Sequence, residues 1–191
     1  SGTCDLEVVE VRVFSWAPLY LNFFRMTAVP KQIETMVPRV KPTSIEVYKD
    51  DIPDHLNFGS AVSVDTEAQG LNFHRDRLCT AQLSDGNGIC HIVQFSANNY
   101  KAKNLKGVLT NPKIKKIFHY ARFDIVILKK YLNITTNPIF CTKIASKIVR
   151  TYTSFHGLKD ITRELLNIDL SKQQQSSDWA ATNLTQEQIL Y

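Results

Sequence analysis

The sequence predicts an α/β fold in which a small antiparallel sheet is followed by alternating helices and strands. Residues 61–66 (AVSVDT) alternate apolar and polar side chains, as a half-buried strand does, and two further strand-like runs follow them. The turn between those two runs reads SDGNG, and its Asp-Gly and Asn-Gly pairs are typical of a β-hairpin. From residue 103 onward, helix-like and strand-like runs alternate, which indicates a mixed sheet flanked by helices.

The individual elements follow from local patterns. Residues 121–132 (ARFDIVILKKYL) carry apolar side chains at the spacing of one helix face, and residues 115–119 (KKIFH) form a short buried strand. Thr185 begins the last helix, and Gln188 completes a TxxQ capping box with it. The first three strands after residue 60 are expected to be antiparallel. Strands are expected at 45–48, 61–66, 78–83, 89–95, 115–119 and 139–141, and helices at 103–109, 121–132, 142–152, 158–166 and 185–191.

The chain divides into two parts of different character. Residues 1–42 show no clean period of 2 or 3.6, and Pro30, Pro38 and Pro42 interrupt their end. We therefore interpret residues 1–42 as an extension and residues 43–191 as the functional domain.

Composition is that of an ordinary globular domain with a basic excess. Hydrophobic residues make up 43% of the 191 residues, and the formal net charge is +5 with a pI of about 9.0. A basic excess suits a polyanionic partner such as nucleic acid, although many basic proteins bind none.

The four cysteines and the longest apolar run limit the other classes of protein. Cys4, Cys79, Cys90 and Cys141 form no CxxC pair and have irregular spacings, which favours reduced thiols in a cytoplasmic protein over disulfides or a zinc site. Residues 14–24 form the longest apolar candidate, and this run is shorter than the ~20 residues that a membrane helix needs. We therefore expect no membrane partner.

Two acids share one face of a predicted strand. Asp65 and Glu67 in VSVDTEAQGL are two residues apart, so their side chains point the same way. Neighbouring carboxylates repel each other unless a cation lies between them, and oxygen ligands favour Mg²⁺ or Mn²⁺. The alternative is a strand end that carries two solvated acids.

Two further segments hold candidate residues. Asp124 lies early in a largely apolar helix, where it is either an exposed residue or a third carboxylate for the same site. Asp178, Trp179 and Tyr191 lie near the end of the chain. Trp179 is expected mainly as a packing anchor, and Tyr191 alone is also compatible with an ordinary amphipathic helix.

Together, these segments resemble the ribonuclease D branch of the DEDD exonuclease superfamily. The motifs are DTE on a strand, HxxxFD on a helix, and SDW followed by LTxxQxxY, in that order. Strings such as GLNFHRDRLCTAQLSDG and LSKQQQSSDWAA are similar to the small alphaproteobacterial members, the nanoRNase C group. The resemblance covers residues 44–191 and implies a ribonuclease H-like fold.

The resemblance also implies a catalytic apparatus. Asp65, Glu67 and Asp124 match metal-binding acids that hold two divalent cations, Mg²⁺ or Mn²⁺, and Tyr191 matches the tyrosine that positions the attacking water. The implied reaction is two-metal hydrolysis of single-stranded RNA from its 3′ end, with short RNA as the substrate and 5′-mononucleotides as products. Members of this type form rings of several subunits, so a homo-oligomer is expected.

Four residues are candidates for binding the substrate. Leu71 is expected either beside the terminal base or in the core, and His119 either near a phosphate or as a satisfied core histidine. Arg122 and Lys172 are expected to approach phosphates.

The family pattern has one further acid. In that pattern an Asp follows the tyrosine after three intervening residues, whereas this sequence stops at Tyr191. The resemblance therefore implies a domain that is incomplete at its C-terminus and impaired in metal binding as given. The competing hypothesis is a non-catalytic or degenerate exonuclease-like module that only binds nucleic acid.

Overall fold

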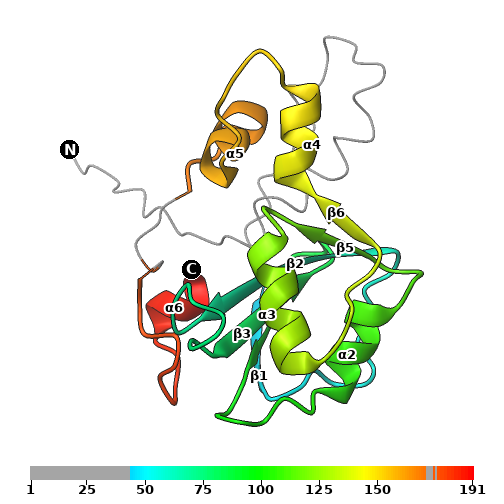
Figure 1. Cartoon of the computed structure of the whole chain (residues 1–191), viewed down its shortest axis with the longest axis vertical. Coiled ribbons are helices and arrows are strands. Elements are labelled where there is room, and N and C mark those ends of the chain that lie inside the picture. Colours follow the sequence, from blue (N-terminus) through cyan, green and yellow to red (C-terminus); the bar gives the residue numbers. More distant parts are fainter. Residues whose placement is uncertain (1–43, 171–173, 175) are drawn as a thin grey trace, which may run out of the picture.

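A six-stranded mixed sheet forms the centre of the molecule (Figure 1). The computed structural model describes residues 44–170, 174 and 176–191, so the predicted extension at 1–42 lies outside the described residues. The strand order is β1-β4-β3-β2-β5-β6. The β2–β3 and β3–β4 pairs are antiparallel, and the β1–β4, β2–β5 and β5–β6 pairs are parallel. The strands are β1 (Ser44–Lys49), β2 (Ala61–Ala68), β3 (Leu78–Ser84), β4 (Ile89–Gln94), β5 (Lys115–Phe118) and β6 (Ile139–Cys141).

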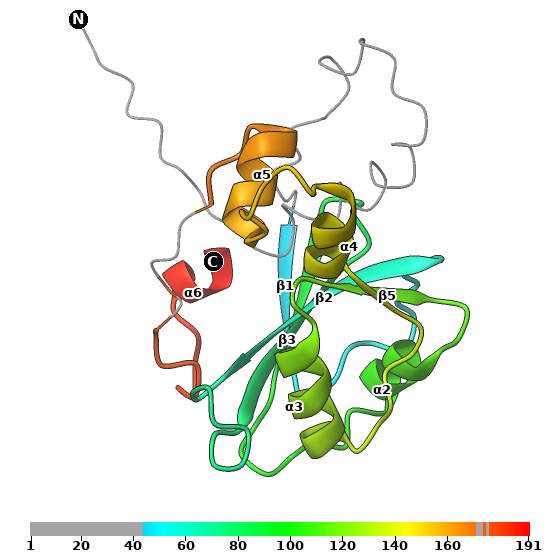
Figure 2. The same ribbon diagram turned by 45° about the horizontal axis from the view of Figure 1, so that its top comes forward.

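Helices cover both faces of the sheet. Leu105 and Leu109 of α2 join Ile127 and Leu128 of α3 in the main core, which packs on one face. On the other face, α5 packs near Ile117 and α6 near Cys90 and Ile92, and Figure 2 shows α4 beside α5 at one end of the molecule. The helices are α2 (Lys103–Thr110), α3 (Arg122–Leu132), α4 (Thr142–Val149), α5 (Leu158–Leu166) and α6 (Gln186–Leu190).

The structure confirms the predicted α/β class and the order of elements. The hairpin strands are antiparallel, and Thr185 and Gln188 form the predicted capping box, with Gln188 N donating to Thr185 Oγ1 over 3.2 Å and Thr185 N donating to Gln188 Oε1 over 2.9 Å. Cys79, Cys90 and Cys141 are free thiols. Every helix within the described ranges is too short or too polar to cross a bilayer.

One predicted helix was too long. The pattern indicated a helix at 142–152, but α4 ends at Val149 because Arg150 leaves the helical conformation, with φ −104° and ψ 60°. The Arg150 side chain is buried, donates to Ser146 Oγ and Phe155 O over 2.8 Å each, and pairs with Glu164 on α5. Tertiary contacts of this one side chain therefore override the helical pattern.

Helix α2 receives its N-terminal cap from a residue far away in the sequence. The residue at its own N-cap position, Ala102, has no side-chain acceptor. Asp51, in the turn after β1, accepts hydrogen bonds from Asn104 N and Leu105 N over 2.9 Å each. The carboxylate satisfies two of the amides that a helix start leaves unpaired, and it fixes α2 against the β1 end of the sheet.

Replacing Asp51 with Ala should therefore destabilise the fold. Loss of the cap is expected to cost about 1–2 kcal/mol, which lowers Tm by about 2–4 °C for each kcal/mol. Thermal unfolding followed by circular dichroism measures this change. Asp54→Ala is the matched control because that side chain is 90% exposed. Equal Tm values for the two variants would contradict the assigned cap.

Candidate active site

The acids of β2 lie on the sheet face that α5 and α6 cover. Val62 and Val64 point into the main core under α2 and α3, so the alternating strand directs Asp65 and Glu67 to the opposite face. Burial raises the pKa of Cys90 to about 12, and the negative charge of Asp65 contributes to that rise. Cys90 packs in a cluster with Ile189 of α6, and the alternation along β2 directs Asp65 to that side of the sheet.

A β-bulge lies beside these acids. Glu67 pairs with Thr80 and Ala68 pairs with Leu78, so Cys79 is an extra residue on β3. Leu78 packs in the main core, whereas Cys79 packs against Trp179 on the other side. Bulges bend a strand and redirect its side chains, and they are common next to active sites. Sequence periodicity gave no signal of this extra residue.

Asp124 is buried at the start of α3. It is the third residue of the helix and only 6% exposed, and Thr66 Oγ1 donates to its Oδ1 over 2.7 Å. Burial raises the pKa of Asp124 well above its usual range, and the negative charge of Asp65 raises it further, against the lowering effect of the Thr66 hydrogen bond. The interpretation of Asp124 as an exposed residue is therefore wrong, and the structure makes Asp65 and Asp124 electrostatic neighbours.

The donors around this pair fit a hard divalent cation. Asp65, Glu67 and Asp124 offer only carboxylate oxygens, which Mg²⁺ and Mn²⁺ prefer. A cation would relieve the repulsion that raises the pKa of Asp124. Within residues 44–170, 174 and 176–191, no three His, Cys, Asp or Glu side chains are arranged so that they could together hold a metal ion. The fit therefore rests on donor chemistry and charge.

Tyr191 lies in a small apolar cluster at the end of the described chain. Its side chain is 3% exposed, and its ring centroid lies 5.9 Å from that of Trp179, which packs on Cys79. Trp179 is 2% exposed, which confirms its expected role as a packing anchor. Burial raises the pKa of Cys79 to about 11, where nearby Arg77 lowers it and the charges of Asp178 and Glu67 raise it. The cluster that holds Tyr191 thus lies in the electrostatic neighbourhood of Glu67.

Gln188 fastens helix α6 to the segment that carries Trp179. Besides its capping-box bond, the side chain donates through Nε2 to Ser177 Oγ and to Asp178 O, both over 3.0 Å. Gln188 is 3% exposed, so solvent does not compete for these bonds. The TxxQ motif therefore has a second role, which is to position the residues that follow it, including Tyr191.

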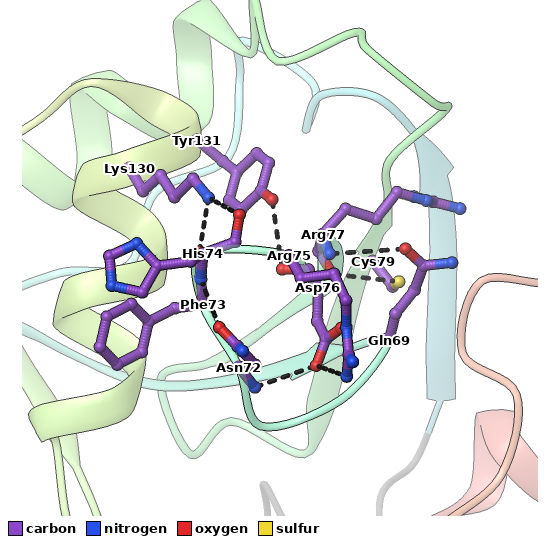
Figure 3. Close-up of polar contacts among 10 residues, drawn as sticks. All are labelled: Gln69, Asn72, Phe73, His74, Arg75, Asp76, Arg77, Cys79, Lys130 and Tyr131. Atoms are coloured by element: carbon purple, nitrogen blue, oxygen red, sulfur yellow. Dashed lines mark hydrogen bonds and ion pairs between the residues drawn. The ribbon is translucent and has the colours of Figure 1, made fainter.

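The loop that carries Leu71 joins β2 to β3 and is fastened by hydrogen bonds to α3 and within itself. Figure 3 shows the loop against α3, where Lys130 Nζ donates to Phe73 O and His74 O over 2.6 and 2.8 Å. Asp76 accepts from Asn72 N over 2.9 Å and pairs with Arg75. Leu71 itself is 87% exposed, so the alternative of a core leucine is wrong.

Three further residues were predicted to bind the substrate: His119, Arg122 and Lys172. Arg122 is exposed at the first position of α3, two residues before Asp124. His119 is half-buried, and its Nδ1 lies 2.9 Å from Thr142 Oγ1, which fits the interpretation of a satisfied histidine as well as a ligand-facing one. Lys172 lies outside the described residues.

A mixed α/β sheet with neighbouring acids is the arrangement expected of a carboxylate-lined nuclease. The sequence profile of a 3′-5′ exonuclease family matches residues 43–191. The chain belongs to this 3′-5′ exonuclease family and is similar to ribonuclease D.

Two relatives show how far the similarity extends. Ribonuclease D of Acidiphilium cryptum strain JF-5 is 28% identical over 138 residues, which are 72% of this chain and 35% of that protein. The chain thus spans about a third of the length of the curated relatives it matches. Brucella melitensis NrnC is 50% identical with a TM-score of 0.74, over 78% of this chain and 72% of that one. NrnC structures also exist bound to pGG and with bound Mg²⁺.

Replacing Asp124 with Asn should stabilise the metal-free protein at neutral pH. A carboxyl whose pKa is raised on folding contributes stability below its unfolded pKa, and this contribution is lost as the pH rises through the folded pKa. The variant removes that loss and keeps an acceptor for Thr66. Mg²⁺ at about 100 times its Kd should stabilise the wild type by about 2.7 kcal/mol and the variant far less.

Thermal unfolding in EDTA and in Mg²⁺, at pH 4.5 and 7.5, measures both effects. Thr66→Val is the companion variant, since it removes the donor and keeps the acids. If the metal-free Asp124→Asn protein is less stable than the wild type at pH 7.5, then the repulsion between Asp65 and Asp124 does not lower the stability of the folded protein.

Proposed function

We propose that residues 43–191 form an exonuclease domain that removes 5′-mononucleotides from the 3′ end of short single-stranded RNA. The observation that carries this proposal is the neighbouring pair of Asp65 and Asp124, which brings together acids from β2 and α3. The binding of pGG by the similar Brucella protein supports a short substrate. The free thiols suit a reducing compartment, so we place the activity in the cytoplasm.

Asp65, Glu67 and Asp124 would hold two divalent cations, and the Mg²⁺ in the Brucella NrnC structure supports this assignment. Such cations lower the pKa of a bound water and neutralise charge on the phosphate. Thr66 keeps one oxygen of Asp124 in a fixed direction through its 2.7 Å hydrogen bond. Tyr191 would orient the attacking water through its hydroxyl. The Tyr191 ring packs against Trp179, and the hydrogen bond from Gln188 Nε2 to Asp178 O holds the Trp179 segment against α6.

The surroundings of the acids suit a single strand with a free end. Leu71 projects from a loop that Lys130 fixes to α3, so it presents an apolar contact for a terminal base without a large ordering cost. His119, Arg122 and Lys172 would contact the phosphates.

Asp65→Asn in the full-length protein should abolish the activity. The variant removes one charge from the proposed cation site and changes no volume, so the rate is expected to fall by at least about 10²-fold. Shortening of a 5′-labelled RNA dinucleotide and heptamer, with Mg²⁺ or Mn²⁺, gives the rate. Asp54→Asn, at an exposed position, is the matched control.

The outcomes separate the two hypotheses from the sequence. Activity in the wild type that persists in Asp65→Asn would eliminate the assigned site. RNA binding without metal-dependent cleavage by the wild type would favour the alternative, a module that only binds nucleic acid.

We also propose that the chain forms a homo-oligomer through α4. Five large apolar side chains on α4 and the loop after it are 50–71% exposed, which is unusual for a surface without a partner. These residues, here called the α4 patch, are Ile144, Ile148, Val149, Tyr152 and Phe155.

Ile148→Lys should disrupt this assembly. A charge in the middle of an apolar interface loses its hydration on association, so the oligomer is expected to dissociate to monomers while the fold is kept. Size-exclusion chromatography with light scattering measures the mass. Ile148→Leu should keep the assembly. A wild-type protein that is monomeric at micromolar concentration would refute the proposal.

A further inference from the structure

The buried hydroxyl of Thr80 has no assigned role. Thr80 lies on β3 and is 0% exposed, and its Oγ1 has no hydrogen-bond partner in the part of the chain that the structure describes. A buried polar atom without a partner costs about 1–3 kcal/mol, and such atoms are rare in native proteins unless a catalytic role, water or ion explains them.

The position of Thr80 suggests its partner. Thr80 is the cross-strand partner of Glu67 in the β2–β3 ladder. Directly opposite residues of antiparallel strands have Cβ atoms about 4.5–5.5 Å apart on one face of the sheet, which is within reach of a glutamate and a hydroxyl. Glu67 is also one of the acids that fit the cation site.

The bulge explains why Leu78 and Thr80 lie on opposite faces of the sheet. Because Cys79 is the extra residue, Leu78 and Ala81 keep their places in the main core while Cys79 and Thr80 lie between them, opposite Glu67. A regular strand would direct Thr80 and Leu78 to the same face. The alternation from Thr80 to Leu83 therefore places Thr80 on the face of Glu67, and the bulge at Cys79 returns Leu78 to the core.

A second buried donor lies nearby. Trp179 packs on Cys79, the residue before Thr80, and its Nε1–H likewise has no acceptor among the described residues. The start of β3 thus has two buried donors, Thr80 Oγ1 and Trp179 Nε1, that have no acceptor among the described residues. This is the environment that a carboxylate requires if it is to hold one defined orientation.

We propose that Thr80 is a positioning residue for Glu67, a role that rests on the proposed metal-dependent function. When a cation is bound, one carboxylate oxygen of Glu67 accepts a hydrogen bond from Thr80 Oγ1, which leaves the other oxygen directed at the cation. The hydroxyl then has its partner only in the cation-bound protein. Thr80 touches neither the substrate nor the cation, and it acts through Glu67.

Thr80→Val tests this role because valine keeps the shape and removes the donor. In the metal-free full-length protein, Mn²⁺ titration by calorimetry should show about 10-fold weaker binding, the usual scale for the loss of a hydrogen bond to a metal ligand. Thr80→Ser should restore the wild-type affinity. Tm of the metal-free Thr80→Val protein should be equal to or above that of the wild type, since an unpartnered hydroxyl has been removed.

A matched control lies elsewhere in the chain. Thr136 is also buried, and its Oγ1 also has no partner in the described part of the structure, but it lies in the segment between α3 and β6 and is not part of the β2–β3 ladder. Thr136→Val should leave Mn²⁺ affinity unchanged. If Thr80→Val fails to fold, the same Mn²⁺ titration is made on Thr80→Ala, which also lacks the hydroxyl and is expected to show the same loss of affinity.

Three results would overturn the proposal. These are wild-type Mn²⁺ affinity in Thr80→Val, equal losses in Thr80→Val and Thr136→Val, or no recovery in Thr80→Ser. Asp65→Asn separates this failure from failure of the proposed function. If Asp65→Asn binds Mn²⁺ as tightly as the wild type, the cation site itself is wrongly assigned. If Asp65→Asn loses affinity and Thr80→Val does not, only the role of Thr80 is lost.

Discussion

The site depends on the repulsion between two carboxylates that the fold holds together. Asp124 is buried at the start of α3, where the negative charge of Asp65 on β2 raises its pKa beyond the effect of burial. Water cannot screen this interaction well because Asp124 is only 6% exposed. Holding the two negative charges this close is unfavourable, so contacts elsewhere in the fold must keep both acids in place.

Three structural features from different parts of the chain shape this end of the sheet. Thr66 donates to Asp124 from the strand that carries Asp65, so one hydrogen bond fixes the helix start to β2. The bulge at Cys79 bends β3 beside Glu67. Gln188 ties α6 to the Trp179 segment, which brings Tyr191 close to the same end of the sheet. Each of these interactions acts on one element, and the first of them holds the start of α3, with Asp124, against the strand that carries Asp65.

Much of the fold was predictable because its signals are local. Alternation in AVSVDT, the SDGNG turn and the TxxQ box each report on a few neighbouring residues, and all three appear in the structure as expected. The predicted helix that was too long has a non-local cause. It ends early because Arg150 pairs with Glu164 on another helix. The cap of α2, on which the local pattern gave no prediction, comes from Asp51 in the turn after β1.

By itself, the sequence determined the α/β class, the strand that carries Asp65 and Glu67, and the family motifs, because periodicity and spacing are properties of short segments. Only the tertiary structure decided that Asp124 is buried beside Asp65, that Leu71 is exposed, and that Thr80 faces Glu67 across a bulge. Burial and electrostatic neighbourhood depend on which segments meet in space. No pattern within one segment contains that information, because the segments that meet are separated by tens of residues in the chain.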